Sequence, residues 1–169
     1  MGHKSSPMPL VLDLLRHGEA EPTHPSGDDE RPLTPRGEQY IRSLGTRLGR
    51  ERWRPSRVFS SPLKRARDSA LIATREAGLA TAVETLEDLG ANQDPGDVMR
   101  GLQELGIVSG HVLLVGHQPL MGRLCQWLTG EERKVTPGSL VRIELQDRSG
   151  PGSGRVVMAL DPPDYLGAA

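Results

Sequence analysis

Residues 10–15, LVLDLL, are followed at once by Arg16, His17 and Gly18, and this stretch decides the fold. A short apolar run that ends abruptly is typical of a buried β-strand. In an open α/β sheet, ligands bind at the carboxyl ends of the strands. A histidine at that place can attack phosphorus, an arginine can neutralise phosphate oxygens, and a glycine lets an anion approach the backbone. The stretch therefore predicts a buried strand that ends at an anion-binding site.

The composition predicts one small domain with no general attraction for nucleic acid or membranes. The chain has 169 residues and a net charge of −1, and 36% of its residues are hydrophobic but only 3% aromatic. We expect a flexible leader over residues 1–9 and a single domain over residues 10–169, with an aliphatic core. No apolar stretch approaches the length of a membrane span. The single Cys125 excludes an internal disulfide and favours a reducing compartment, so we expect a cytoplasmic protein.

Strand-like and helix-like segments alternate along the chain. Proline, often behind a capping residue such as Thr34, Ser61 or Asp94, marks the helix starts. We expect helices from Pro35, from Ser61-Pro62 to about residue 77, from Pro95 to residue 105, and from Pro119 to about residue 128. Strands are expected at residues 10–15, 57–60, 83–86, 111–115, 139–145 and 155–160. The last two strands predict a hairpin around the turn-rich residues 147–154, followed by an extended tail.

Two of the expected strands end in a glycine and a histidine. Residues 10–15 lead into His17 and Gly18, and residues 111–115 lead into Gly116 and His117. In a parallel sheet, these two strand ends lie at the same edge. Helices that begin just after the strands add N-terminal N–H groups and dipoles, which attract anions. The combination predicts a phosphate pocket.

Four ordered motifs resemble those of the histidine phosphatase superfamily. They are LRHGEA at residues 15–20, RPLTPRG at 31–37, SSPLKRA at 60–66 and GHQP at 116–119. Within the superfamily, the chain is most similar to the small SixA-type phosphohistidine phosphatases. This resemblance implies an α/β fold with three α/β/α layers and a mainly parallel central sheet, as in phosphoglycerate mutase. It also implies a phosphohistidine intermediate, with no metal and no cofactor.

The resemblance assigns a role to each motif residue. His17 matches the nucleophile, Arg16 and Arg65 match the phosphate-binding arginines, and His117 matches the second pocket histidine. Two arginines can hold phosphoryl oxygens in charge-assisted contacts and stabilise the charge of the transition state. His17 must be neutral to attack, with its other ring nitrogen bound to an acceptor that the sequence does not identify. His117 is more useful when it is protonated, and a nearby phosphate favours that state.

The proton donor for the leaving group is expected in the loop after residues 83–86. Asp88 is the candidate acid and Glu87 the alternative, although the glycine-rich context of larger superfamily members is not reproduced. A phosphohistidine substrate would have an imidazole leaving group, so its demand for an acid differs. Only 28 residues separate Asp88 from His117. This short connection predicts an open pocket, which suits a phosphate carried on a protein surface better than it suits a mutase.

Three functions stay open at this point. The first is a phosphatase acting on protein phosphohistidine, the second a phosphatase acting on small phosphomonoesters, and the third a noncatalytic phosphate-binding module. The complete set of Arg16, His17, Arg65 and His117 argues against the third. The sequence has no P-loop, and position 131 holds Glu131 where a cysteine phosphatase would need arginine.

For the remaining polar residues, structural or surface roles are expected first. His111 and His117 would lie about 20 Å apart along an extended strand, too far to share a metal ion. We expect the acidic residues 28–30 to be solvated charges, with contact to a basic partner as the alternative. His24 lies in the same loop and could border the pocket. The oligomeric state is not predicted.

Overall fold

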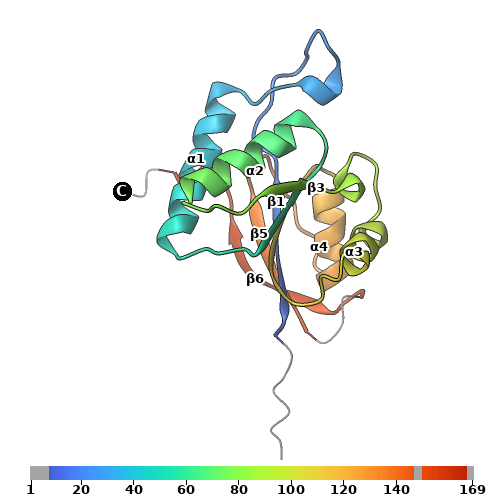
Figure 1. The fold of residues 1–169 in the computed structure, drawn as a ribbon. Helices are drawn as coiled ribbons and strands as arrows, with labels where there is room; N and C mark the ends of the chain where they lie inside the picture. Colours follow the sequence, from blue (N-terminus) through green and yellow to red (C-terminus); the bar gives the residue numbers. More distant parts are fainter. Residues whose placement is uncertain (1–7, 147–149, 167–169) are drawn as a thin grey trace, which may run out of the picture.

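The computed structural model describes residues 8–146 and 150–166 and shows a six-stranded sheet between helices (Figure 1). The strands lie in the order β3-β2-β4-β1-β5-β6. The strands are β1 Leu10–Arg16, β2 Arg57–Ser60, β3 Val83–Thr85, β4 Gly110–Gly116, β5 Leu140–Leu145 and β6 Gly154–Leu160. The helices are α1 Pro35–Arg50, α2 Lys64–Glu76, α3 Pro95–Glu104 and α4 Leu120–Thr129. Two short 3-10 helices, η1 Asp28–Glu30 and η2 Glu87–Leu89, lie in loops.

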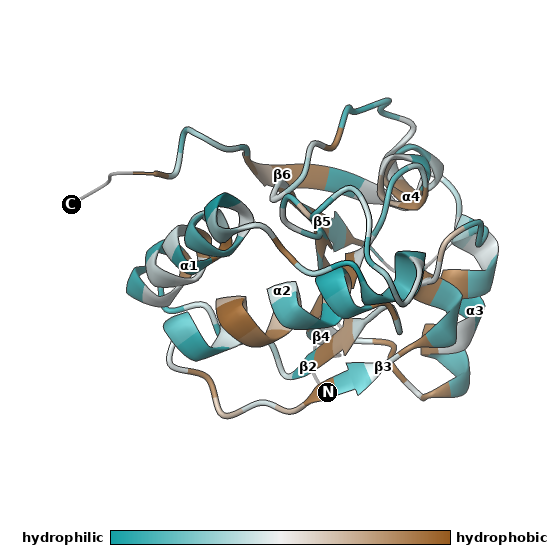
Figure 2. Ribbon diagram, turned by 90° about the horizontal axis from the view of Figure 1, so that it is seen from above, coloured by the Kyte–Doolittle hydropathy of each residue, from teal (hydrophilic) through white to brown (hydrophobic). Residues whose placement is uncertain are grey.

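The sheet is mainly parallel, and the expected three-layer α/β/α architecture is confirmed. The neighbours among β1 to β4 pair in parallel, whereas β5 is antiparallel to β1 and forms the expected hairpin with β6. Apolar side chains of α1 and α2 form one core cluster with the sheet, and those of α3 and α4 form another. Seen from above, the two helix pairs flank the strands on opposite sides (Figure 2).

Strand β1 is covered on both faces, which explains its almost continuous apolar sequence. Leu12 and Leu14 belong to the cluster with α3 and α4, and Leu15 belongs to the cluster with α1 and α2. Hydrogen-bonded neighbours on both edges, β4 and β5, hold the strand in register. The residues that follow β1 therefore start from a rigid base in the middle of the sheet.

Two local expectations were wrong. Helix α2 begins at Lys64 rather than at Pro62, because the Ser61 hydroxyl accepts a hydrogen bond from the Leu63 N–H at 3.1 Å and holds a turn before the helix. The segment after residue 160 is not extended but forms turns that bury Tyr165, whose hydroxyl donates to the Gly138 carbonyl at 2.9 Å. Residues 1–7 of the expected leader and residues 147–149 of the expected turn lie outside the described residues.

The one acidic residue of β1, Asp13, is fully buried and is held by three donor side chains. Its carboxylate accepts hydrogen bonds from Trp53 Nε1 at 2.7 Å and from Arg142 Nε at 2.7 Å, and it pairs with His111 Nε2 at 2.5 Å. Burial alone would raise the pKa of Asp13, but the hydrogen bonds and charges of His111 and Arg142 outweigh it and lower that pKa. His111 thus has a structural partner at the far end of the sheet from His117.

Removal of the Asp13 carboxylate should strongly destabilise the fold. We expect Asp13→Ala to lower the free energy of unfolding by about 3 kcal/mol, because it leaves the buried Trp53 N–H and the partly buried Arg142 and His111 without their acceptor. Urea unfolding followed by circular dichroism measures this change. Asp68→Ala, which removes only a surface ion pair with Lys64, is the control and should cost less than about 1 kcal/mol. Equal effects of the two substitutions would contradict the structural role of Asp13.

Candidate active site

The carboxyl ends of β1 and β4 bring His17 and His117 together. The two strands are adjacent and parallel, with Arg16 opposite Gly116, and the His17 N–H donates to the Gly116 carbonyl at 3.0 Å. The two imidazole rings have their centroids 5.0 Å apart and are tilted by 55°. Residues a hundred positions apart thus meet at the sheet edge where the sequence places a phosphate pocket.

His17 is held as a neutral imidazole with a defined tautomer. Its Nδ1 lies 2.7 Å from the Gly18 carbonyl oxygen, which can only accept, so Nδ1 carries the proton. Burial lowers the pKa of His17 to about 3; the Gly18 hydrogen bond opposes this shift, while the charges of Arg65 and Arg16 add to it. Near neutral pH, Nε2 therefore has a free lone pair. The Gly18 carbonyl is the acceptor that the sequence could not identify.

Two buried arginine edges face no protein acceptor. Arg16 donates through Nη1 to the Val135 carbonyl at 3.1 Å, and Arg65 donates through Nη1 and Nη2 to Asp28. In both guanidinium groups, the buried Nε atom has no hydrogen-bond partner among the described residues. Unpaired buried donors are costly and rare, so each calls for a functional explanation. An anion between the two arginines would satisfy both.

His117 adds a third unpaired atom to the same place. Its Nε2 lies 2.7 Å from the Ser61 hydroxyl, while its buried Nδ1 has no partner among the described residues. Burial lowers the pKa of His117 to about 4; Arg65 and Arg16 act in the same direction, whereas Asp28 raises it. A phosphoryl dianion beside Nδ1 would raise the pKa of His117, as Asp28 does, because a nearby negative charge favours the protonated ring.

The comparisons with known proteins agree with this geometry. A sequence model of the histidine phosphatase superfamily (branch 1) matches residues 12–105, which include Arg16, His17 and Arg65 but end before His117. The chain belongs to the histidine phosphatase superfamily. None of the curated proteins matches it.

Several solved structures are similar to this histidine phosphatase. The protein histidine phosphatase SixA complexed with tungstate is 28% identical, with a TM-score of 0.76 over 91% of this chain and 98% of that chain. Phosphoglycerate mutase from Bacillus anthracis str. Sterne is 16% identical, with a TM-score of 0.71 over 96% and 97%. The alpha-ribazole phosphatase from Shigella flexneri is 19% identical, with a TM-score of 0.68 over 86% and 94%. The family and the SixA likeness make this chain a phosphatase.

Gly18 has a packing role that the sequence did not reveal. Its N–H donates to the Ser69 hydroxyl at 3.0 Å, so this amide is already paired within the protein. A β-carbon on Gly18 would lie 2.9 Å from Ile41 Cγ1 and 3.1 Å from the Gly37 carbonyl oxygen. The close approach of the strand end to α1 therefore requires glycine. Approach of an anion to this backbone, the expected reason for the glycine, stays a prediction.

Asp88 and Glu87, the candidate acids, lie in η2 beside α3. The Asp88 carboxylate packs on the backbone of Gly101, where a β-carbon would come within 2.5 Å of Oδ2. Glu87 is exposed. Among the described residues, neither carboxylate has a hydrogen bond or ion pair with the two histidines or the two pocket arginines. Their role as acid stays a prediction.

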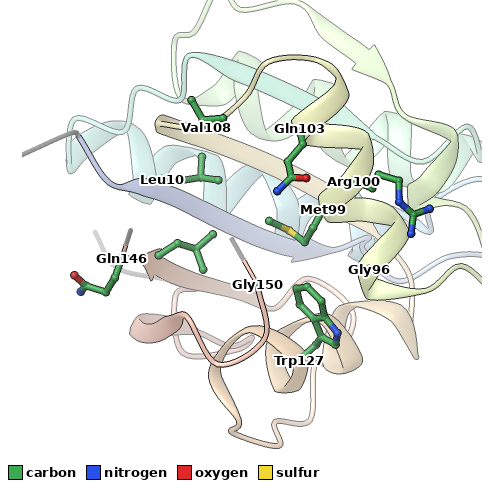
Figure 3. A pocket seen from close by; sticks show the side chains of 10 residues that line it. Leu10, Gly96, Met99, Arg100, Gln103, Val108, Trp127, Gln146 and Gly150 are labelled. Carbon is green, nitrogen blue, oxygen red and sulfur yellow. The ribbon is translucent and has the colours of Figure 1, made fainter. Parts of the chain in front are cut away.

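A cavity of about 660 Å³ in the phosphatase lies away from the histidines (Figure 3). Leu10, at the start of β1, and Trp127 of α4 line it, and Arg100 is the only titratable residue among its lining residues. It has no nucleophile beside a base, so it lacks the chemistry of the strand-end site. Within the described residues, no cluster of His, Cys, Asp and Glu is suited to a metal ion, and no helix is long and apolar enough to cross a membrane.

Proposed function

We propose that this phosphatase hydrolyses phosphohistidine on a protein, through a phosphohistidine intermediate on its own His17 and without a metal ion. The observation that supports it most is that three side chains acting electrostatically on the neutral His17 each have a buried nitrogen atom without a partner among the described residues: the Nε atoms of Arg16 and Arg65 and Nδ1 of His117. They offer an anion two positive charges and several donors at one place. The likeness to a SixA protein histidine phosphatase supports the same substrate class.

The proposed reaction has two displacements at phosphorus. His17 Nε2 attacks the phosphoryl group while Arg16 and Arg65 hold its oxygens. The substrate imidazole carries a proton on its other ring nitrogen, so that when its bond to phosphorus breaks it leaves as neutral imidazole. A water molecule then attacks phosphorus from the open side. The bond from phosphorus to Nε2 breaks, and inorganic phosphate leaves with His17 restored. The arginines stabilise the charge that spreads over the phosphoryl oxygens in both steps.

The surroundings of the pocket favour a substrate whose leaving group needs little help from a carboxylic acid. Among the described residues, Asp28 is the only carboxylate in contact with the pocket arginines. Its hydrogen bond with Arg31 and the charge of Arg65 hold its pKa below the usual range, so it is ionised and cannot donate a proton near neutral pH. A phosphohistidine ring can carry a proton on its second nitrogen near neutral pH and then leaves as neutral imidazole, whereas an alkoxide must receive a proton from a donor as it leaves.

A small phosphomonoester is the second candidate substrate, in line with the likeness to an alpha-ribazole phosphatase. Such a substrate requires an acid, and Asp88 is then the candidate. A noncatalytic role is set aside, because the chain belongs to the histidine phosphatase superfamily and is similar to a SixA protein histidine phosphatase. We further propose a cytoplasmic enzyme, since the buried Cys125 is a free thiol, and we propose no nucleic-acid or membrane partner.

The test compares kcat/KM for a phosphorylated histidine phosphotransfer domain with that for a panel of small phosphomonoesters, all in the presence of a chelator. We expect the phosphoprotein to be preferred at least about 100-fold. Asp88→Asn should keep most of the activity on the phosphoprotein, because the imidazole leaves without an acid. If the enzyme instead preferred one small ester, and Asp88→Asn abolished its activity on that ester, the second candidate would be favoured. Loss of activity in chelator, restored by a metal ion, would contradict the metal-free mechanism.

A further inference from the structure

Residues 21–31 form an exposed strap beside the pocket. The base of the strap is fixed by the hydrogen bond from the Glu21 N–H to the Pro32 carbonyl at 2.8 Å, and all of residues 22–30 are exposed. The strap projects beyond α1 and α2 and carries η1 (Figure 1). No buried side chain fixes its tip, so polar contacts must hold it in place.

Asp28 supplies those contacts, and it does so through Arg65. Its backbone carbonyl accepts from Arg65 Nη1 at 2.9 Å, and its Oδ2 accepts from Arg65 Nη2 at 3.2 Å. Its Oδ1 accepts from Arg31 Nε at 2.8 Å, and Arg31 in turn donates to the Glu21 carbonyl at 2.7 Å. The Arg65 side chain is 6% exposed and the Asp28 side chain 65%, so the carboxylate lies between the guanidinium and solvent.

We propose that Asp28 is a positioning residue for phosphoryl transfer, which holds two nitrogens of Arg65 so that its Nε edge faces the phosphoryl group. The proposal rests on the proposed function, because it assigns Arg65 to the phosphoryl group. A guanidinium held at one edge keeps its other edge in a fixed direction, which lowers the cost of ordering it when substrate binds. The unpaired, buried Nε is the atom that this arrangement leaves for an anion.

The charge of Asp28 and its hydrogen bonds to Arg65 have opposite effects on a bound phosphoryl group. A carboxylate beside a phosphate site repels the phosphate dianion, so Asp28 weakens phosphate binding while it orients the arginine that stabilises the transition state. It also favours a protonated His117. The charged and titratable groups around His117 are Arg16 at the end of β1, His17 directly after it, Arg65 on α2, and Asp28 and Arg31 on the strap.

These opposing effects give Asp28→Asn a signature that a purely structural role would not produce. We expect kcat to fall about 10- to 100-fold, since a small misplacement of a catalytic group has effects of that size. Inorganic phosphate should inhibit the variant several-fold more tightly, because the like charge is gone. If His117 must be protonated for turnover, the basic limb of the kcat–pH profile should move to lower pH, because loss of the nearby negative charge lowers the pKa of His117.

Asp29→Asn is the matched control. Asp29 is the next residue of the same exposed turn, loses the same charge, and has no side-chain hydrogen bond or ion pair among the described residues. Asp29→Asn should keep kcat and the inhibition constant of inorganic phosphate within about twofold of the parent. Equal behaviour of the two variants would overturn the proposal, as would weaker phosphate inhibition of Asp28→Asn together with its lower kcat.

An NMR readout separates this inference from the proposed function. The Nε–H signal of Arg65, recorded with inorganic phosphate bound, should be sharp in the parent and in Asp29→Asn and should broaden in Asp28→Asn. An unchanged signal in Asp28→Asn would overturn the positioning role even if the enzyme turns over phosphohistidine. Conversely, an absence of turnover on every substrate would contradict the proposed function. The NMR signal of Arg65 would then still show whether Asp28 positions this arginine.

Discussion

His17→Ala should abolish turnover on every phosphorylated substrate. Its Nε2 has a free lone pair, because the Gly18 hydrogen bond places the proton on Nδ1, and the ring lies beside Arg16, Arg65 and His117. Without that atom, the first displacement cannot occur, and direct attack by water lacks a base. We expect kcat/KM to fall by at least about 10⁴-fold, as when other enzymes lose a covalent nucleophile.

Two measurements check this expectation. The first is steady-state kinetics of His17→Ala, with His24→Ala as the control. His24 is an exposed histidine of the strap, and its one side-chain hydrogen bond among the described residues is from the Ser26 N–H. The second is rapid quenching under alkaline conditions, which should trap a phosphorylated enzyme in the parent and none in His17→Ala. Residual activity above about 1% in His17→Ala, or a trapped phosphoenzyme, would show that another residue is the nucleophile.

The parts of this molecule that could be predicted from sequence are those that depend on local pattern. The apolar residues 10–15 gave a buried strand because both faces of β1 are covered, and the ends of β1 and β4 meet because parallel neighbours share an edge. Thr34 was expected to cap a helix, and its hydroxyl does accept from the Gly37 N–H at 2.9 Å. Each of these predictions needs only the next few residues or the general rules of sheet topology.

What the sequence could not provide are contacts between polar residues far apart in the chain. Asp28 meets Arg65 across 37 positions, and nothing in the acidic residues 28–30 distinguishes Asp28 from Asp29. Ser61 reads as a helix cap but binds His117, 56 positions away. Such pairs depend on the path of a loop and on the direction of a side chain, and neither produces a periodic pattern in the sequence. They are also the contacts that set the orientation and charge of the pocket groups.

Arg65→Lys should be nearly as damaging as the loss of the nucleophile, although it keeps the positive charge. Arg65 uses two nitrogens to hold Asp28 and keeps a third for the phosphoryl group, a division that one ammonium group cannot reproduce. We expect kcat/KM to fall about 10³-fold, equivalent to about 4 kcal/mol of transition-state stabilisation. Most of the loss should be in kcat, because a lysine still attracts the phosphate of the ground state.

Arg67→Lys is the control for this substitution. Arg67 lies two residues further along α2 but is exposed, and it belongs to the same basic cluster in the sequence. It should keep kcat/KM within about twofold of the parent. If Arg65→Lys lost activity mainly through KM, Arg65 would act as a simple point charge for substrate capture. The buried Nε edge would then be a matter of packing, and the two-sided use of this guanidinium would have no part in catalysis.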